Sequence, residues 1–503
     1  MTRTNSDRAL PGLPQLEISV GGTPLVERDR PALLELVVRA QLSAPTQCEL
    51  AFDLAAISAE LAGVEAGDPL RVRAAGEPLF EGAVTAAELE YAASGAQVLR
   101  VRGYDVLHSL RKRQTVRAHV EVTVAELARE LCGDLGVSVD AGSTGPLFHH
   151  VIQHRQSDLE LLTELSARSG LFFWLRGSTL QLMTLEGGGA PISLELGRGL
   201  LEASFELNTD RSCQDVTASG WSPGEVTPYL AQVSAPRVGR STEDPGGSAA
   251  SPGRTLVSEG VEDAAQLEAV AQAELDRRVA AELIFRGVSD GDPRLIPGAR
   301  VEIAGVAPRA RGTYVLCSVT HRVNPEAGFV SELSTEPPAP PPKPTGASVA
   351  LGRVTRVDGT TGRVRASLLA HREVETDWMQ VAAPGAGAGK GLTMIPDVGD
   401  SVLVVFTQED PARGVVLGGL PGKNAPHDTG VKGGAVLRFN LRSAGGQQLR
   451  LDDDRRVLRI ENAGGSFIEL APGGITVHSG GQLTLEGGQV TIRGSAVDFE
   501  EAG

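Results

Sequence analysis

Hydrophobic and polar residues alternate along much of this chain, most regularly near its C-terminal end. Alternation with a period of two predicts β-strands with one apolar and one polar face. Between residues 458 and 499 the apolar residues come in pairs with one residue between the members, and the last four pairs recur seven or eight residues apart. The segment is therefore an internal repeat. Its paired residues are Leu458, Ile460, Ile468, Leu470, Ile475, Val477, Leu483, Leu485, Val490, Ile492, Val497 and Phe499.

A short strand with one apolar face cannot bury that face alone. We predict that three identical chains wind around a common axis over residues 426–503, with the twelve paired residues as their shared core and Gly pairs such as Gly464-Gly465 at the corners. Winding also removes exposed strand edges. Burial of each Val, Leu or Ile contributes about 1.5–3 kcal/mol, which favours the trimer. An ordinary two-sheet β domain and a single-chain solenoid remain the alternatives.

The rest of the chain is also predicted to be mainly β. Residues 1–14 form a tail, and short alternating strands over 15–115 predict a small antiparallel barrel. Residues 116–190 predict an α/β insert, with helices opened by Thr123 and by the capping box of Ser157 and Glu160. Strands and one helix over 191–335 predict a second barrel. A Pro-rich linker at 336–348 leads to a five-stranded, OB-like barrel at 349–425.

Composition excludes several classes of protein. The net charge is −16, whereas nucleic-acid binding needs a basic surface, so no nucleic-acid partner is expected. The four cysteines are far apart and form no CxxC pair, which argues against a zinc site or a disulfide framework. The first 15 residues contain no apolar h-region, and no run approaches 18 apolar residues. We therefore expect a chain made in the cytoplasm without a signal peptide.

Several motifs together resemble one family. The motifs Gly362-Arg363-Val364, Trp378-Met379, Pro396 to Val402 and Asp410-Pro411 closely resemble the OB module of VgrG proteins and phage baseplate spikes. Two positions depart from that pattern, with Glu409 where Gly is usual and Gly414 where Pro is usual. The segments 149–174 and 291–323 resemble the hub of the same proteins, the second in the version seen in phage-like contractile injection particles.

The resemblance implies a trimer with a hub, an OB collar and a needle. It implies that six hub barrels from three chains join the sixfold inner tube to the threefold needle, and that sheath contraction drives the needle through a target envelope. The implied partners are the inner-tube ring, baseplate proteins, a PAAR-type tip protein and effector cargo. We expect Asp498, Phe499, Glu500 and Glu501 to contact the tip protein. The assembled chain would belong to a tail or injection particle, delivered outward or released extracellularly.

No catalytic, cofactor or metal site is predicted. The needle repeat follows the collar closely and leaves no room for a hydrolase. His149, His150 and His154 precede the capping box and are expected on a strand or turn, with structural roles. The run Asp452-Asp453-Asp454 is expected to be solvated, and Arg111-Lys112-Arg113 to be a solvated face or a subunit contact. Residues 385–390 contain glycines and a lysine but lack the ending and the helix of a phosphate loop.

Two other functions compete with the spike. A wall-degrading tail hydrolase would need paired carboxylates in a groove. A trimeric fibre that binds a receptor or glycan could use the same three-chain repeat, but such fibres usually end in a head with aromatic grooves. Aromatic residues make up only 4% of this chain. The spike is therefore the leading hypothesis.

Overall fold

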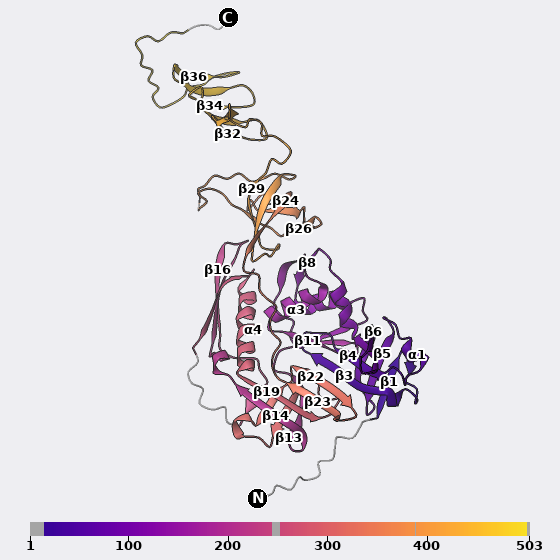
Figure 1. Ribbon diagram of the computed structural model, residues 1–503. Helices are drawn as coiled ribbons and strands as arrows, with labels where there is room; N and C mark the ends of the chain where they lie inside the picture. Colours follow the sequence, from indigo (N-terminus) through magenta and orange to yellow (C-terminus); the bar gives the residue numbers. More distant parts are fainter. Residues whose placement is uncertain (1–14, 244–251, 388, 500–503) are drawn as a thin grey trace. The chain divides into compact units, whose positions relative to one another are not determined.

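The computed structural model describes residues 15–243, 252–387 and 389–499 and divides into two compact units (Figure 1). Unit 1 runs from Met1 to Gly419 and unit 2 from Leu420 to Gly503. The chain is mainly β, as predicted. The Pro-rich segment 336–348 lies within unit 1, and the chain divides about 75 residues later, after the OB barrel.

A single fifteen-stranded sheet dominates unit 1. Its N-terminal half encloses a core that includes Phe52, Leu99 and Val101, and its C-terminal half encloses a second core around Phe285 and Tyr314. The N-terminal strands are β1 (Leu16–Val20), β2 (Thr23–Pro24), β3 (Leu33–Gln41), β4 (Gln47–Asp53), β5 (Pro69–Ala74), β6 (Glu77–Tyr91) and β7 (Gln97–Tyr104). The others are β13 (Gly188–Leu196), β14 (Gly199–Leu207), β17 (Ser241–Thr242), β19 (Leu283–Asp290), β20 (Ala299–Ala304), β21 (Gly312–Val315), β22 (Ser318–Asn324) and β23 (Gly328–Ser334).

The two halves are continuous, which the sequence did not predict. β22 pairs antiparallel with β3, with His321 opposite Val38 and Val323 opposite Leu36. Val323 and Phe329 also belong to the first core. The sequence analysis predicted two separate barrels, over residues 15–115 and 191–335. In the structure they share backbone hydrogen bonds, because strands nearly 300 residues apart pair with each other.

The predicted α/β insert is present. α2 (Val124–Cys132) begins at a capping box of Thr123 and Glu126, and α3 (Asp158–Arg168) at the capping box of Ser157 and Glu160, as predicted. The insert also contains β8 (Arg117–Val122) paired with β10 (Phe148–Gln153), and a sheet of β9 (Ser138–Ala141), β11 (Phe172–Arg176) and β12 (Thr179–Met183). The short helices of unit 1 are α1 (Ala59–Ala62), η1 (Arg30–Ala32), η2 (Val106–Lys112), η3 (Thr209–Arg211) and η4 (Pro308–Ala310).

Part of the predicted second barrel forms a layer of its own. β15 (Val216–Ser222), β16 (Thr227–Val233) and β18 (Arg254–Gly260) make a three-stranded sheet that packs on α4 (Ala264–Glu282), with Leu267, Ala271 and Leu275 in the contact (Figure 1). The last part of unit 1 is a six-stranded sheet that encloses a small core, as an OB barrel does. Its strands are β24 (Ala347–Val357), β25 (Val364–Leu368), β26 (Val374–Glu375), β27 (Gln380–Val381), β28 (Ser401–Thr407) and β29 (Gly414–Gly419).

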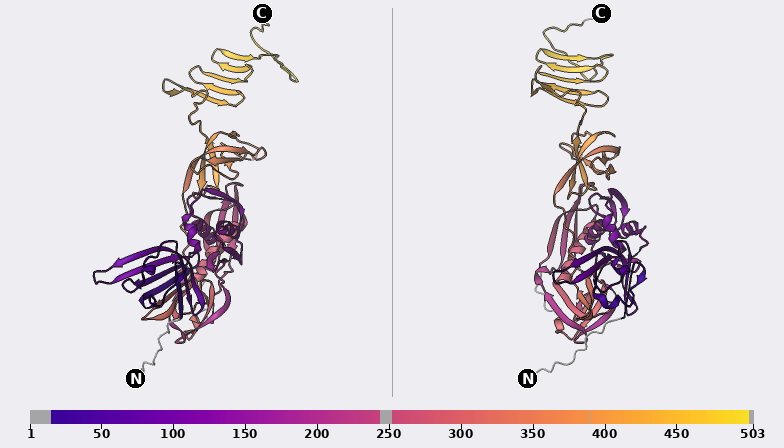
Figure 2. Two further views of the ribbon diagram at one scale, coloured as in Figure 1. Left: turned by 90° about the vertical axis from the view of Figure 1, so that its right-hand side faces the viewer. Right: turned by 45° about the vertical axis from the view of Figure 1, so that its right-hand side comes forward.

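Unit 2 contains a flat five-stranded antiparallel sheet in which each strand pairs with the next along the chain (Figure 2). Gly464-Gly465 and Gly473 lie in its hairpin turns, and Gly465 has a φ of 84°, a conformation open to Gly. In the single chain these glycines therefore lie where the chain reverses direction between antiparallel strands. The winding of three chains around an axis stays a prediction. The sheet contains β32 (Arg438–Arg442), β33 (Gln448–Asp452), β34 (Val457–Glu461), β35 (Phe467–Ala471) and β36 (Gly474–His478), and it follows a pair of β30 (Val431–Lys432) and β31 (Ala435–Val436).

Candidate assembly surface and its neighbouring sites

The register of unit 2 sorts its residues into two opposite faces. Residues opposite each other in an antiparallel pair point to the same face. One row across the five strands is Phe439, Leu451, Leu458, Leu470 and Ile475, and the next is Leu441, Leu449, Ile460, Ile468 and Val477. We call these ten residues the apolar face. The row between them, on the opposite face, is Asn440, Arg450, Arg459, Glu469 and Thr476.

The apolar face is exposed to solvent. Eight of its ten residues are exposed, among them Ile475 at 71% and Phe439 at 59%. Contiguous apolar surface of this kind marks an interaction site in a protein. A one-layer sheet also has no core of its own, so within the described residues of unit 2 this face lacks a cover.

Several side chains of the polar face contact one another within the chain. Arg459 Nη1 donates to Glu469 Oε2 at 3.0 Å, and its guanidinium lies 3.7 Å from the centre of the Phe467 ring. The ring of His478 stacks on the Phe467 ring, with the ring centres 5.1 Å apart. The two faces therefore differ in kind, because the apolar face has no polar side chains to pair, whereas charged and aromatic side chains of the polar face contact one another.

A clasp at the start of the sheet fixes β32. Arg438 donates two hydrogen bonds of 2.8 Å to the carboxylate of Asp428, and Asn440 donates a third. These bonds, led by the one from Arg438, hold the pKa of Asp428 well below its usual range. Asp428 is thus charged at any ordinary pH, and the clasp does not titrate.

The sequence analysis selected twelve residues for the needle core. Six of them, from Leu458 to Val477, belong to β34, β35 and β36 and lie on the apolar face. The other six, from Leu483 to Phe499, follow in a stretch that forms no strand in the described chain, and all six are exposed. Their place in a shared core stays a prediction. Of the expected tip contacts, Asp498 and Phe499 are exposed, whereas Glu500 and Glu501 lie outside the described residues.

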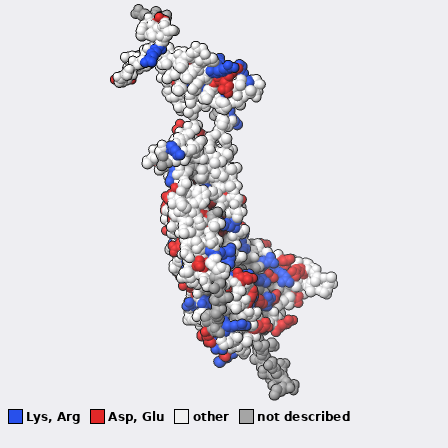
Figure 3. Space-filling view, turned by 90° about the vertical axis from the view of Figure 1, so that its left-hand side faces the viewer, with Lys and Arg blue, Asp and Glu red and all other residues white. Residues whose placement is uncertain are grey.

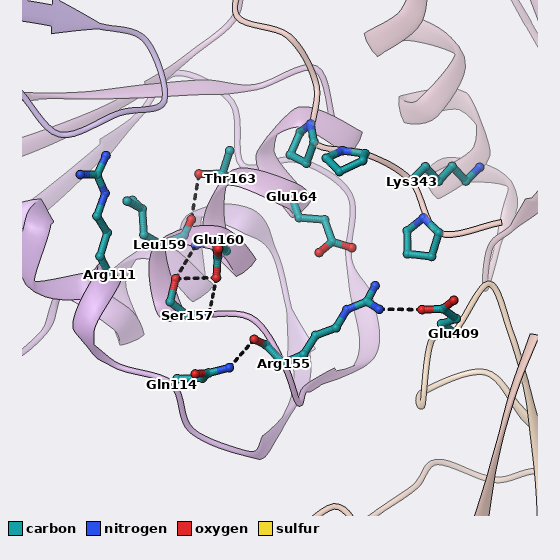
Figure 4. Close-up of a pocket in the computed structure, with 13 residues that line it drawn as sticks. Arg111, Gln114, Arg155, Ser157, Leu159, Glu160, Thr163, Glu164, Lys343 and Glu409 are labelled. Atoms are coloured by element: carbon teal, nitrogen blue, oxygen red, sulfur yellow. Dashed lines mark hydrogen bonds and ion pairs between the residues drawn. The ribbon is translucent and has the colours of Figure 1, made fainter. Parts of the chain in front are cut away.

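A second candidate site lies inside unit 1, where the OB barrel meets the α/β insert (Figure 4). It is a hollow of about 830 Å³ between the start of α3, the Pro-rich segment and the β28–β29 loop. Arg155 Nη1 crosses it to Glu409 Oε2 at 2.7 Å. Glu160 accepts hydrogen bonds from the backbone N–H and hydroxyl of Ser157, and the backbone bond leads in lowering the pKa of Glu160. Its carboxylate therefore serves as a helix cap.

Two buried arginines lie deeper in this junction. Arg168 of α3 and Arg413 before β29 both donate to the backbone carbonyl of Gly260, at the end of β18. Burial lowers the pKa of Arg168 to about 10, and the nearby charge of Arg413 acts in the same direction. Lys343 of the Pro-rich segment pairs with Glu259 beside them. The Pro-rich segment is thus attached to unit 1 and is not a free linker.

The sequence analysis did not find this junction. Arg168, Arg413 and Gly260 are far apart in the chain, and only the unusual Glu409 in the collar motif pointed toward it. That residue has a φ of 56° in the β28–β29 loop. Gly414 is explained by packing, because an added Cβ would lie 2.5 Å from Met379 Sδ and 2.8 Å from Val404 Cγ1.

The three histidines lie on and after β10, as expected. The side chain of Glu121 accepts from His149 Nδ1 at 3.0 Å and raises the pKa of that imidazole. His150 Nε2 donates to the carbonyl of Glu375 in the OB barrel, and the ring of His154 lies 5.8 Å from that of His371. Two of the three therefore contribute to the junction between the insert and the OB barrel.

The remaining candidates have ordinary roles. The run Asp452-Asp453-Asp454 was expected to be solvated, but Asp452 is buried and accepts from the backbone N–H of Arg455. Asp454 pairs with Lys432. Arg113 donates to both oxygens of Asp134, and Arg111 lies over the Tyr104 ring. No helix follows residues 385–390 in the described part of the OB barrel.

The described residues contain no cluster of three or more His, Cys, Asp or Glu side chains placed to hold a metal ion. The four cysteines are buried and free in the structure. None of the described helices is long and apolar enough to cross a membrane.

Comparisons with known proteins match the OB barrel and a long N-terminal part of the chain. A family model described as the type VI secretion system/phage-baseplate injector OB domain matches residues 350–420, and one described as the Alg8 N-terminal domain matches residues 72–325. The type VI secretion system spike protein VgrG4b of Pseudomonas aeruginosa is 25% identical over 366 residues, which cover 61% of this chain and 44% of that protein. The chain thus spans less than half the length of this relative.

Solved structures share the fold. The Escherichia coli c3393 protein, a component of the type VI secretion system, has a TM-score of 0.53 at 15% identity over 80% of this chain and 99% of its own. A chain of the Francisella PdpA-VgrG complex has a TM-score of 0.55 at 9% identity over 94% of this chain and 89% of its own.

The fold, the OB module and the one-sided terminal sheet define a VgrG-like baseplate spike protein. Just over half of the chain matches the second family model, and the chain belongs to the Alg8 N-terminal domain family. Its relatives include a spike protein and another component of type VI secretion systems.

Proposed function

We propose that this chain is the central spike of a contractile injection machine and works as a homotrimer. Three copies join a sixfold inner tube to a threefold needle, which punctures the target envelope when the sheath contracts. The observation that carries the proposal is the apolar face of unit 2, exposed on one side of a one-layer sheet whose other side is polar. Three such sheets, packed face to face around an axis, cover one another.

The surface of unit 2 supports this arrangement. On the side shown in Figure 3, charged side chains are dense on the lower part of unit 1, whereas on unit 2 they gather in one cluster and most of the surface is uncharged. Burial of each Leu, Ile or Val of the apolar face contributes about 1.5–3 kcal/mol, less the cost of ordering the chains, so the ten positions of each copy favour association. Pairing with a copy of itself satisfies the face without any other protein.

The chain's part in the machine is structural, with no catalytic activity of its own. Its partners are the inner-tube ring, baseplate proteins, a PAAR-type tip protein bound near Asp498 and Phe499, and effector cargo. The existence of a PdpA-VgrG complex in Francisella supports the cargo role. The spike leaves the cell as part of the injection particle.

The test is the mass of the purified chain in solution. Light scattering after size exclusion is expected to give three times the 52.5 kDa mass of the chain. A monomer at micromolar concentration would contradict the proposal. Peptidoglycan clearing on a zymogram would contradict the structural role.

A further inference from the structure

A cavity of about 280 Å³ lies beside the Pro-rich segment, inside unit 1. It adjoins the hollow described above, with which it shares Arg155, Glu164, Lys343 and Glu409 (Figure 4). Residues of β10, α3, α4, β18 and the β28–β29 loop line it, together with the prolines between residues 340 and 344. The volume is close to the lower limit of about 300 Å³ for pockets that hold small organic molecules.

Most of the cavity wall is apolar. Besides the prolines, the apolar side chains that line it include Phe148, Ile152, Leu161, Leu165, Leu256 and Val270. They come from β10, α3, β18 and α4. Pockets for small molecules combine a wall of this kind with a few polar groups that fix the orientation of the ligand. The wall therefore suits the hydrocarbon part of a ligand.

Two guanidinium groups that line the cavity share one acceptor. Arg168 Nη2 and Arg413 Nη1 both donate to the backbone carbonyl of Gly260. Arg413 is only 6% exposed, and burial lowers the pKa of Arg168 to about 10, which leaves Arg168 charged at neutral pH. Two positive charges so close together repel each other, and an anion beside both would remove the repulsion.

The two arginines differ in their anionic partners. Asp410 Oδ2 lies 3.3 Å from Arg413 Nε. Among the described residues, no carboxylate forms an ion pair with Arg168, whose Nη2 donates to a neutral carbonyl. A charge removed from water is costly unless an opposite charge accompanies it. Arg168 is therefore the lining cation that an anionic ligand would satisfy.

The other lining carboxylates already have polar partners. Their ion pairs are Glu259–Lys343, Glu274–Arg277 and Glu409–Arg155. Glu164, four residues before Arg168 on α3, accepts from Gln156 Nε2 at 3.0 Å. Residues four apart on a helix are neighbours on its surface. Glu164 is thus the carboxylate that competes with a ligand for Arg168.

We propose that this cavity binds a small amphipathic carboxylate of the medium-chain fatty acid class, with its carboxylate at Arg168 and Arg413 and its hydrocarbon chain among the apolar side chains of α3, α4 and β18. A carboxylate matches the planar fork of a guanidinium group, which can donate two parallel hydrogen bonds to it. Inorganic phosphate would use the arginines and leave the apolar wall uncovered. The ligand site goes beyond the spike function and does not depend on the number of chains in the spike.

Two ion pairs border the entrance from the hollow. Arg155 pairs with Glu409 on one side, and Lys343 of the Pro-rich segment pairs with Glu259 on the other. The side chains of Arg155 and Lys343 are 47% and 48% exposed. Ion pairs of such exposed groups are weak. A ligand can therefore enter by opening one pair, and the fold of unit 1 stays intact.

The test is isothermal titration calorimetry of the full-length chain with octanoate at pH 7.5. Octanoate is expected to bind at one site per chain. Octan-1-ol, which lacks the charge, and inorganic phosphate, which lacks the hydrocarbon chain, should each bind at least about tenfold more weakly. Absence of octanoate binding, or phosphate binding as tight as that of octanoate, would overturn the proposal.

Three variants assign the binding to this cavity. Arg168→Gln removes the unpaired charge, and Val270→Phe fills the cavity from α4 without a change of charge; each should weaken octanoate binding at least about tenfold. Glu164→Gln is the matched control on α3 and should bind octanoate at least as tightly as the wild type, because the competing carboxylate is gone. Circular dichroism shows whether each variant is folded, and Val270→Phe keeps the test decisive if Arg168→Gln does not fold.

Octanoate could also bind the apolar face of unit 2. Binding that is unchanged in both Arg168→Gln and Val270→Phe would place the ligand there and overturn the cavity site. The trimer mass measured by light scattering is a separate result, so failure of the ligand site leaves the spike proposal standing.

Discussion

Glu409 in the loop between β28 and β29 has its carboxylate 2.7 Å from the guanidinium of Arg155, while its backbone has a φ of 56°. A left-handed backbone costs a residue with a Cβ about 1–2 kcal/mol, and an exposed ion pair contributes about 0.2–1 kcal/mol. The similar OB modules usually have Gly at this position, where a positive φ is not strained. Glu409 has a strained backbone here, and its ion pair with Arg155 connects the OB barrel to the α/β insert.

We expect Glu409→Gly and Glu409→Ala to separate these two effects. Glu409→Ala loses the ion pair and keeps the strain, so it should lower the free energy of unfolding by up to about 1 kcal/mol. Glu409→Gly loses the pair but relieves the strain, and should unfold at or slightly above the wild-type temperature. Differential scanning calorimetry at low salt measures both. An equal loss in the two variants would contradict the strain argument.

Substitution on the two faces of β36 should have opposite outcomes. Ile475→Asp places a charge on the apolar face and is expected to abolish trimers, because three uncompensated carboxylates would be buried near one axis. Thr476→Asp, one residue along on the polar face, should leave trimers intact. Sedimentation velocity of the two variants gives the answer. Intact trimers with Ile475→Asp would show that this face is not the shared one.

Gly414 should resist even a methyl group. Its Cβ would approach Met379 Sδ and Val404 Cγ1 to 2.5 Å and 2.8 Å, so Gly414→Ala should destabilise the OB barrel by about 1–3 kcal/mol. Gly418→Ala in the same strand is the matched control, since nothing lies within 4 Å of its added Cβ. Chemical denaturation of both variants compares them. Equal stability would mean that Met379 moves aside at no cost.

His321 should make the large sheet sensitive to acid. Burial lowers its pKa from 6.5 to about 4, and its Nε2 donates to the carbonyl of Leu295 at 3.0 Å. The folded chain therefore binds fewer protons than the unfolded chain between these two pH values. Stability from this residue is complete above pH 6.5 and falls by about 3 kcal/mol as the pH drops to about 4.

The variant His321→Gln isolates that effect. It does not titrate, and it keeps a donor for Leu295 and an acceptor for Ser331. Burial raises the pKa of Asp105 to about 6, and this shift acts in the opposite direction in the same range. Because both proteins contain Asp105, the difference between their free energies of unfolding, followed from pH 7 to 4, reports His321. A constant difference would contradict the prediction.

Local signals in the sequence predicted local structure well. The caps at Thr123 and Ser157 were predicted because each involves residues three positions apart. The alternation from Leu458 to Val477 predicted strands with one apolar face for the same reason. These features depend on residues that are a few positions apart in the chain, and the sequence gives that spacing directly.

Long-range pairing was not predicted. β22 joins β3 across nearly 300 residues, and Arg413 reaches the carbonyl of Gly260 across 153. Neither strand has a pattern that selects its partner, since alternating residues fit many neighbours. A hydrogen bond from an arginine side chain to a backbone carbonyl cannot be predicted from the sequence, because every residue has a backbone carbonyl.

The place of the apolar face in the chain sets the order of events during synthesis. A ribosome releases unit 1 before the strands of unit 2, and domains generally fold as units in that order. The apolar face of unit 2 therefore leaves the ribosome only after the large sheet has had time to form. Neighbouring nascent chains on one messenger RNA would meet through the strands of unit 2 when the barrels of unit 1 are already folded. This order limits wrong strand pairing between incomplete copies.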